Sequence, residues 1–495
     1  MSMPRKKEEI YSVKKPAGKA EREPEKPKRP RQSRSAAAME TVTKAKEPPR
    51  NKAKEPPRTK AKEKRAETIH AGDLRMLIRR KPDMTVILIA VLTAVFEILG
   101  MLLASAHTQS TLGIDSYGSM AVIVPLGLLT TLVLPLIMPM DALLMALVNF
   151  ICGVGIVTLS TVSPLRGVRQ VESYVLSILA MILTGQIVIH LKRPRGLTIF
   201  LMIAGIGILI LPLLFGKWNN GAKNWVSVPL FGSFQPSELV KVSVIFALAY
   251  SFSTHRTLLQ MIPALLFSAL CLLILMLQRD LGTALIYYLS TLIVFYIACG
   301  NIPLTLVGVG GGVGAAILGY QMFAHVKVRV AMWRNPWSDP TGSGYQIIQA
   351  LLAIGSGGLF GVGLGQGTPE KIPEYYNDFI FAVICEQFGQ VFGILLILVY
   401  LLIILRGAAM VGRSRTSFTL LLGYGALAMF GIQTFMITAG VIKLIPLTGV
   451  TMPFLSYGGS SMLSCMSMVG VLHGIVGKSQ LELEEDVLIK GRDAY

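Results

Sequence analysis

Two clusters of charged residues stand where the surrounding sequence is apolar. In Gln235–Lys241 (QPSELVK), Glu238 and Lys241 are three residues apart, so they share one face of a helix. In Gln278–Thr283 (QRDLGT), Asp280 stands where an apolar run begins. A charged side chain inside a membrane segment is energetically unfavourable, so it is usually paired with another group or has a function. Glu238 and Lys241 either form a local ion pair or line a polar cavity, and Asp280 either caps a helix or serves a site.

A third cluster places two carboxylates ahead of and within another apolar run. In Asn377–Glu386 (NDFIFAVICE), Asp378 opens the segment and Glu386 follows eight residues later. If one helix begins at Asp378, both side chains lie on nearly the same face, with Glu386 roughly 12 Å deeper. Asp378 alone is compatible with helix capping. Two carboxylates on one face, one of them embedded in the apolar run, make capping alone a less complete explanation.

The segment between Arg329 and Lys371 combines cationic side chains with glycine. It holds Arg329, Arg334 and Lys371, together with a glycine-rich run over residues 355–367. Backbone amides in such a run can form a nest for an anion. With the basic side chains nearby, a pyrophosphate would suit this segment. The alternative is a turn-rich loop without a ligand.

A fifth stretch, Pro446–Ser461, is rich in proline, glycine and hydroxyl residues and ends in Ser460 and Ser461. Such irregular backbone is tolerated at membrane depth where it lines a cavity. No histidine stands near a serine or cysteine in the manner of a catalytic triad, so the sequence gives no support to acyl transfer.

Apolar helices must position these residues. The chain has 495 residues, of which 52% are hydrophobic and only 15% are charged. Apolar runs of about 20 residues recur and are long enough to cross a bilayer. We predict an all-α transmembrane bundle of about twelve spans, centred near residues 95, 128, 150, 182, 206, 246, 267, 290, 313, 391, 428 and 466. Two long loops, 216–238 and 325–378, fall on one side.

Two further segments give local predictions. Tyr345–Phe360 reads as an interfacial or re-entrant helix, because it is too short to span. The glycine-rich run 308–319 lies within a span and predicts close helix packing.

Charge is divided unevenly along the chain. Residues 1–82 contribute +15 of the formal net charge of +19. Proline pairs and the repeat KAKEPPR, at Lys44–Arg50 and Lys52–Arg58, predict a disordered tail over residues 1–80. A basic tail ahead of a span is typical of a cytoplasmic segment that touches anionic lipid, so we assign it no nucleic acid. Basic loops alternate in the same sense and place both termini in the cytoplasm.

Five motifs together resemble those of the SEDS family (FtsW, RodA and SpoVE). They are QPSELVK, RDLGT, WRNPWSDPTGSGYQIIQALLAIGSGGLFGVGLG, KIPEYYNDFIFAVICEQFG and IPLTGVTMPFLSYGGSS, in the family's order. The family's common form has about ten spans, so the pair near residues 119–160 is additional. Lys443 stands where glycine is common in the family. The resemblance divides the chain into the tail (1–80), N-terminal spans (81–165), a SEDS-like core (166–478) and a cytoplasmic C-terminal tail (479–495).

The resemblance implies a peptidoglycan glycosyltransferase of the bacterial cytoplasmic membrane that polymerises lipid II at the outer leaflet. It assigns the catalytic base to Asp378. Cavity or pyrophosphate contacts are expected from Glu238, Lys241, Asp280, Arg329, Arg334, Lys371, Glu386, Ser460 and Ser461. No cofactor is certain, although Glu238 and Asp280 would suit Mg²⁺ or Mn²⁺. The expected partner is a class B penicillin-binding protein, in division, elongation or sporulation.

Two other functions fit part of the same sequence. A lipid II flippase or another transporter would also bury charge in a many-helix bundle. Such a protein would place its charges near the midplane and show repeat symmetry, whereas these charges gather at one lip. A non-catalytic scaffold of the division machinery would not need Asp378.

Overall fold

The computed structural model describes residues 82–107, 113–218, 221–228, 232–254 and 258–492. These residues belong to one compact unit, Ala61–Tyr495. The predicted basic tail and its repeats lie outside the described residues.

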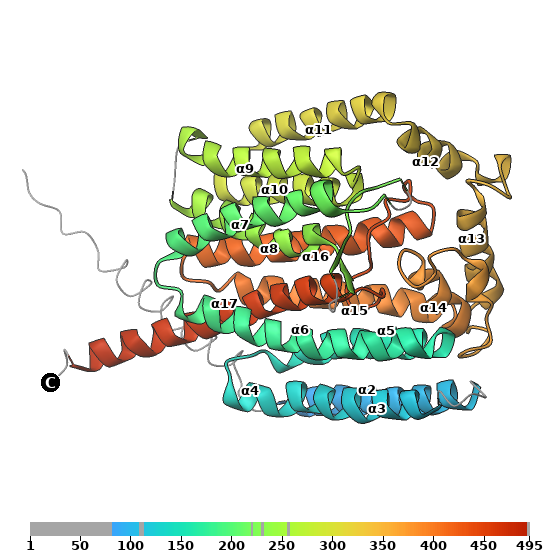
Figure 1. Cartoon of the computed structure of the whole chain (residues 1–495). Helices are drawn as coiled ribbons and strands as arrows, with labels where there is room; N and C mark the ends of the chain where they lie inside the picture. The colour runs from blue at the N-terminus through green and yellow to red at the C-terminus, as the bar shows by residue number, and fades with distance from the viewer. Residues whose placement is uncertain (1–81, 108–112, 219–220, 229–231, 255–257, 493–495) are drawn as a thin grey trace, which may run out of the picture. The chain divides into compact units, whose positions relative to one another are not determined.

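The described chain is built almost entirely from helices (Figure 1). The long ones are α2 (Met84–His107), α3 (Gly113–Leu128), α5 (Ala142–Val162), α6 (Pro164–His190), α7 (Pro194–Phe215), α8 (Pro236–Thr254), α9 (Leu258–Leu277), α10 (Leu281–Cys299), α11 (Ile302–Met322), α15 (Gln390–Val411), α16 (Ser417–Val441) and α17 (Gly459–Arg492). A π-helical turn, η1 (Leu129–Val133), joins α3 to α4 (Leu134–Ile137).

The all-α transmembrane prediction is confirmed. Eleven helices in the described part of the chain are long and apolar enough to cross a membrane. They correspond to eleven of the twelve predicted spans. The twelfth, near residue 246, is α8, which has 19 residues and carries Glu238 and Lys241. Most of its side chains are buried, so α8 is a central helix of the bundle.

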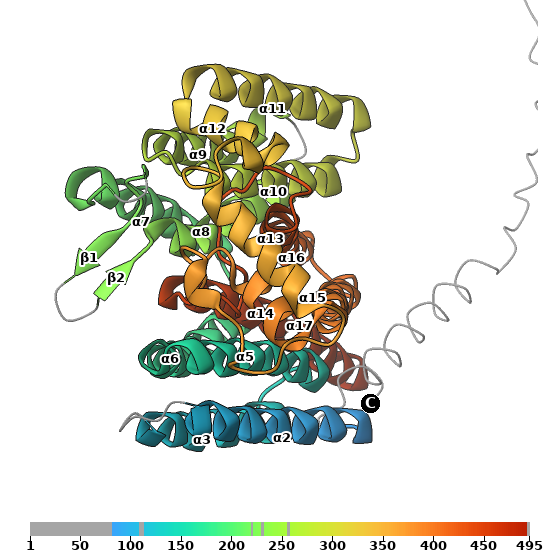
Figure 2. The same ribbon diagram turned by 90° about the vertical axis from the view of Figure 1, so that its right-hand side faces the viewer.

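Burial separates the inner helices from the outer ones. In α5, 89% of the most apolar window is buried, and α17, which packs along α6, reaches 83%. By contrast, α2 and α3 pack beside α5 at one flank, and α11 packs on α10 at the opposite flank (Figures 1 and 2). The buried apolar core therefore lies between these two flanks.

The glycine-rich part of α11 packs closely at only two of its glycines, so the predicted close packing holds for a small part of the run. No residue of α11 is buried in the described structure. Added Cβ atoms would clash only with Leu292 at Gly308 and with Tyr288 at Gly312, and four other glycines of the helix have no neighbour so close. Gly308 and Gly312 therefore pack against α10, and the other four face outward because α11 contacts α10 and α12 alone among its substantial partners.

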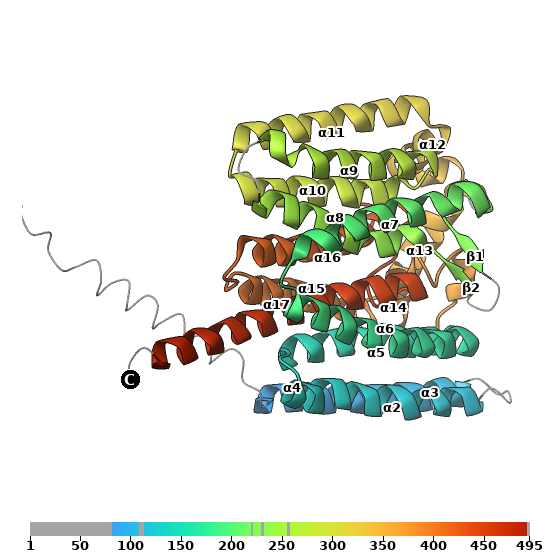
Figure 3. The same ribbon diagram turned by 60° about the vertical axis from the view of Figure 1, so that its left-hand side comes forward.

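The long loops gather at one end of the bundle, which we call the loop end. It contains the antiparallel strands β1 (Val226–Val228) and β2 (Gly232–Phe234), with Val226 opposite Phe234. It also contains α12 (Ala324–Arg334), η2 (Pro336–Ser338), α13 (Tyr345–Gly357), η3 (Pro369–Lys371) and α14 (Ile380–Phe388). Figure 3 shows the hairpin and α12–α14 at the same end. The short helix α13 matches the predicted interfacial segment.

The prediction that one span begins at Asp378 is wrong. Asp378 lies in a turn, the short helix α14 follows, and the chain breaks at Gly389, whose φ is +90°. Only then does the long helix α15 begin. An added Cβ at Gly389 would lie 2.3 Å from the carbonyl oxygen of Leu359, so the backbone passes too close for a side chain. The break lets α14 fold back onto α13.

Candidate active site

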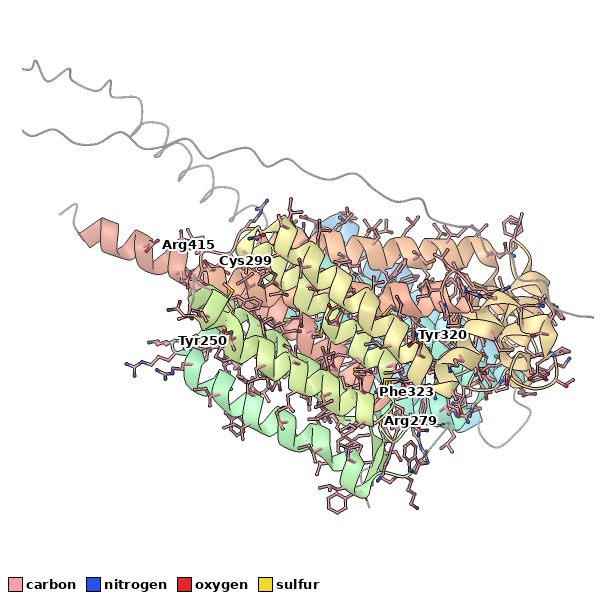
Figure 4. All side chains as sticks on the ribbon, turned by 90° about the horizontal axis from the view of Figure 1, so that it is seen from above. Tyr250, Arg279, Cys299, Tyr320, Phe323 and Arg415 are labelled. Atoms are coloured by element: carbon pink, nitrogen blue, oxygen red, sulfur yellow. The ribbon has the colours of Figure 1, made fainter. Side chains whose placement is uncertain are left out.

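A cavity of about 660 Å³ opens at the loop end. Its walls come from segments far apart in the sequence, namely the hairpin region, α12, the turn before α14 and the segment before α17. Lining residues include Lys217, Trp218, Asn224, Trp225, Gln235, Arg329, Glu374, Tyr376, Asn377, Asp378, Gly449 and Thr451. In Figure 4, Arg279 and Phe323 mark this end, and Tyr250 and Arg415 mark the other. The predicted base and one predicted cation, Arg329, therefore share one cavity.

Asp378 lines this cavity together with a second acid, Glu374. It does not cap α14, because the N-cap is Phe379 and no side chain caps that helix. The helix-capping alternative for Asp378 therefore does not hold. Burial, together with the charges of Glu374 and Asp280, raises the pKa of the Asp378 carboxyl to about 7, and the charge of Arg329 opposes them. A carboxyl with a pKa near neutrality is well suited to accept a proton from a hydroxyl.

Gly449 forms the wall between the acid and Arg329. Its φ is +72°, and an added Cβ would lie 3.4 Å from Nη2 of Arg329 and 3.5 Å from Oδ2 of Asp378. Nη1 of Arg329 donates to the carbonyl oxygen of Thr448 at 3.1 Å. The backbone at Thr448 and Gly449 therefore holds the guanidinium at the cavity wall and also passes close to Asp378.

Asp280 lies behind the cavity and holds its wall together. Oδ1 caps α10 by accepting from the backbone N–H of Thr283 at 3.1 Å. Oδ2 accepts from the side-chain amides of Asn224 at 3.0 Å and Gln235 at 2.9 Å, both of which line the cavity. Capping is therefore confirmed, and Asp280 also fixes two cavity residues in place. Its role is positional.

Glu238 and Lys241 form an ion pair inside the bundle. Nζ of Lys241 lies 2.7 Å from Oε2 of Glu238, and the Lys241 side chain is fully buried. Lys241 also donates to Oε1 of Gln433 on α16 at 2.6 Å. Gln433 donates in turn to the carbonyl oxygen of Thr451 at 2.8 Å. The network connects α8 and α16 to the cavity wall, and neither charged residue lines the cavity.

The network continues through the predicted hydroxyl residues. Ser461 Oγ lies 2.7 Å from Oγ1 of Thr451, a cavity residue. Ser460 Oγ accepts from the backbone N–H of Gln235 at 3.4 Å. Both serines therefore support cavity residues.

Hydrogen bonds also join the segment before α17 to the turn that carries Asp378. Ser456 Oγ donates to the carbonyl oxygen of Asn377 at 2.6 Å and accepts from the N–H of Met452 at 2.7 Å. The N–H of Tyr457 donates to the carbonyl oxygen of Tyr376 at 2.8 Å. The buried Gln170 on α6 donates to the carbonyl oxygen of Ser456 at 3.1 Å. These bonds fix the backbone on either side of the catalytic candidate.

Three predicted site residues lie elsewhere. Arg334 and Lys371 are exposed and do not line the cavity. Glu386 is buried and accepts from the N–H of Thr368 at 3.0 Å. It points to the loop after α13, so it does not share a face with Asp378.

The glycine-rich run does not form the expected anion nest. The N–H groups of Val362 and Gly363 donate to the carbonyl oxygens of Glu386 and Gln387, and Gly361 donates to Gly357. These amides close the end of α14 and of α13, and the run does not line the cavity. The run serves to pack α13 against α14.

The carboxylates proposed for a metal are engaged with protein donors. Asp280 accepts from Thr283, Asn224 and Gln235, while Glu238 is paired with Lys241. Within the described ranges, no group of three or more His, Cys, Asp or Glu side chains is arranged to hold a metal ion. This donor set does not fit a divalent cation.

The sequence reasoning missed Glu374, Lys217, Asn224 and the aromatic residues of the cavity. Glu374 stands four residues before Asp378 and adopts φ of +55°, a left-handed conformation that is rare outside glycine. Such backbone strain often accompanies functional sites. The length of the 216–238 segment indicated a functional loop. Length alone does not identify Lys217 and Asn224 as the side chains that face the cavity.

Comparison with known proteins gives a consistent result. Residues 128–480 match the protein family described as "Cell cycle protein", which comprises FtsW, RodA and SpoVE. Peptidoglycan glycosyltransferase RodA from Mycobacterium bovis is 30% identical over 362 residues, covering 67% of this chain and 77% of that protein. Stage V sporulation protein E from Bacillus subtilis is 38% identical over 288 residues, covering 55% and 76% respectively.

A solved structure shares the fold. It is described as "Structural coordination of polymerization and crosslinking by a peptidoglycan synthase complex", and its similar chain superposes with a TM-score of 0.57 at 25% identity. The match covers 69% of this chain and 98% of the other.

Proposed function

This chain belongs to the FtsW/RodA/SpoVE family, and on that premise we propose that it is a peptidoglycan glycosyltransferase that polymerises lipid II in the cavity at the loop end. The observation that carries the assignment is the cavity itself. It places a carboxyl with a pKa near 7, Asp378, beside the guanidinium of Arg329 in a space of about 660 Å³. In glycosyl transfer a base can take the proton of the attacking hydroxyl, and a cation can stabilise the leaving pyrophosphate.

Asp378 acts as the general base. The acceptor lipid II offers the 4-hydroxyl of its GlcNAc, which becomes a competent nucleophile as its proton passes to a carboxylate oxygen of Asp378. The hydroxyl oxygen then bonds to the anomeric carbon of the donor MurNAc. The bond between that carbon and the pyrophosphate oxygen breaks, and undecaprenyl pyrophosphate leaves with the electron pair.

Cationic side chains of the cavity stabilise the leaving group. Negative charge builds on the pyrophosphate in the transition state, and preorganised donors at that place lower the barrier. Arg329 offers a guanidinium held by Thr448, and Lys217 lies exposed at the cavity rim. We assign the pyrophosphate to Arg329 first, because Arg334 and Lys371 do not line the cavity.

The membrane setting completes the proposal. The chain is a multi-pass membrane protein, and we place it in the bacterial cytoplasmic membrane with both termini inside and the cavity at the outer leaflet. The alternating basic loops support this orientation.

We also propose a class B penicillin-binding protein as partner, because the similar solved structure is that of a polymerising and crosslinking complex. Co-purification in mild detergent tests this directly. Full activity of the isolated chain, unchanged by any such protein, would contradict it.

The activity is tested with the purified full-length chain and lipid II in detergent micelles. We expect glycan strands to form, because a micelle has no second leaflet and the reaction needs none. A flippase or a scaffold would leave lipid II unpolymerised under the same conditions, with and without the partner. A mock preparation from cells that do not produce the chain, carried through the same purification, controls for contaminating polymerases.

A further inference from the structure

A second polar site lies inside the bundle, far along the chain from the catalytic candidate. A small pocket of about 10 Å³ lies between α2, α3 with η1, and α5. Its lining includes Thr93 and Glu97 of α2, Thr131 of η1 and Asn149 of α5. A space of this size holds about one water molecule. All four side chains are buried.

Glu97 is the unusual member of this group. It lies near the middle of a membrane-spanning helix and is 4% exposed. Its carboxyl is turned toward α5, because an added Cβ at Gly153 would lie 2.5 Å from Oε1. Among the residues that the structure describes, its carboxyl has no hydrogen-bond or ion-pair partner, and no Lys, Arg or His lines the cavity. A carboxylate in such a place requires a proton or another cation as counter-charge.

The surrounding oxygen atoms are arranged around the cavity. Thr93 and Glu97 are four residues apart and share a face of α2. The π-helical turn η1 lets two adjacent residues, Thr130 and Thr131, both accept from Nδ2 of Asn149 at 2.8 Å. Tyr174 on α6 donates to Oδ1 of Asn149 at 2.7 Å and so fixes the orientation of the amide. Single π-helical turns are frequent at functional sites.

We propose that Glu97, Thr93 and Thr131 form an intramembrane binding site for one monovalent cation, either H⁺ or Na⁺. The carboxylate supplies the charge and the two threonine hydroxyls supply neutral oxygen ligands. The other titratable groups near Glu97 are Cys152 on α5 and Tyr174 on α6, and neither offers a positive charge. The alternative is an acid that keeps its proton permanently and binds nothing.

Carbodiimide labelling separates these possibilities. Dicyclohexylcarbodiimide reacts with protonated carboxyls in apolar surroundings, and the modified residue is identified by mass spectrometry of the full chain in micelles. We expect Glu97 to be labelled at mildly acidic pH and labelling to be lost as pH rises. Glu97→Gln should abolish that label, whereas Glu172→Gln, which changes an exposed carboxylate at the loop end of α6, should leave it intact.

The two cations are distinguished by exchanging Na⁺ for N-methyl-glucamine. Protection from labelling by Na⁺, with a Tm raised by Na⁺ in the native chain and not in Glu97→Gln, identifies Na⁺ as the ligand. Labelling that depends on pH alone identifies an exchangeable proton. Labelling that is independent of both pH and Na⁺, or no labelling of Glu97 at all, would overturn the proposal in favour of a permanently neutral or inaccessible acid.

Discussion

At the scale of single residues, catalysis depends on one carboxyl with a shifted pKa, that of Asp378. Asp378 is surrounded by protein on the side of the bundle, and burial disfavours its charged form. Glu374 adds a second negative charge in the same cavity, and Arg329 partly offsets it. Burial, the neighbouring carboxylates and the Arg329 guanidinium therefore set the pH range in which the base is available.

The pH dependence of polymerisation follows from this arrangement. Only ionised Asp378 can accept a proton, so the rate should rise with pH through about 7 and level off above it. Below that pH the rate should fall by about tenfold per pH unit. In Glu374→Gln the neighbouring charge is removed, so the midpoint should move to lower pH. A rate that does not change between mildly acidic and mildly alkaline pH would contradict the role of Asp378 as the base.

The same shift affects stability with a defined sign. Folding raises the pKa of Asp378 from 3.8 to about 7, so the folded protein binds this proton more tightly than the unfolded chain. The contribution of Asp378 to stability is therefore most favourable below pH 3.8 and is lost as pH rises toward 7. At neutral pH the ionised carboxylate disfavours the fold, which is typical of a residue kept for function.

At the scale of elements, the position of Asp378 depends on two segments, the turn before α14 and the segment before α17, keeping their places relative to each other. Ser456 joins them, because its hydroxyl contacts both Met452 and Asn377, the residue before Asp378. In Ser456→Ala these two bonds are lost at a cost of about 1 kcal/mol each. We expect polymerisation to slow by roughly ten- to a hundredfold, because small misplacements of a reacting group are costly.

The measurement for Ser456→Ala is glycan formation together with Tm. Ser338→Ala provides the matched control, since Ser338 is exposed at the same end and bonds only within its own turn. Equal rates for both variants and the native chain would show that the two segments hold their positions without Ser456.

The buried ion pair lies within α8, and its Lys241 joins α8 to α16 by donating to Gln433. In Lys241→Met the carboxylate of Glu238 loses its only ion-pair partner among the described residues, which should destabilise the bundle by about 3–5 kcal/mol. The double variant Glu238→Gln/Lys241→Met leaves no buried charge and should recover most of that loss. Thermal unfolding in detergent measures both. A single variant as stable as the native chain would mean that the pair contributes little to helix packing.

The sequence predicted best those features that depend on neighbouring residues along the chain, and predicted poorly those that depend on contacts between distant segments. The cap formed by Asp280 and the glycine preference at Lys443, whose φ is +63°, follow from local backbone geometry. The span count followed from apolar length. By contrast, the break at Gly389 and the direction of Glu386 depend on contacts between α13 and α14. Arg334 and Lys371 belong to the same segment as Arg329, but only Arg329 lines the cavity, because the fold of the segment decides which side chains face it.

At the scale of the whole molecule, the orientation in the membrane can be tested independently of activity. Ser343 is exposed at the loop end, and Ser417 is exposed at the opposite end. A cysteine at Ser343 should react with an impermeant maleimide in intact cells, and one at Ser417 only after lysis. Native background is low, because four of the five native cysteines are buried. The reverse labelling pattern would place the cavity on the cytoplasmic side and exclude polymerisation at the outer leaflet.

The most direct test of the central claim is the activity of Asp378→Asn. Asn is nearly isosteric with Asp, and removal of a carboxylate with a raised pKa should leave Tm unchanged or higher. Because Asn cannot accept the hydroxyl proton, glycan formation from lipid II by the purified variant should fall by about 10²–10⁴-fold. Near-native glycan formation at an unchanged Tm would remove Asp378 from the mechanism and contradict the account.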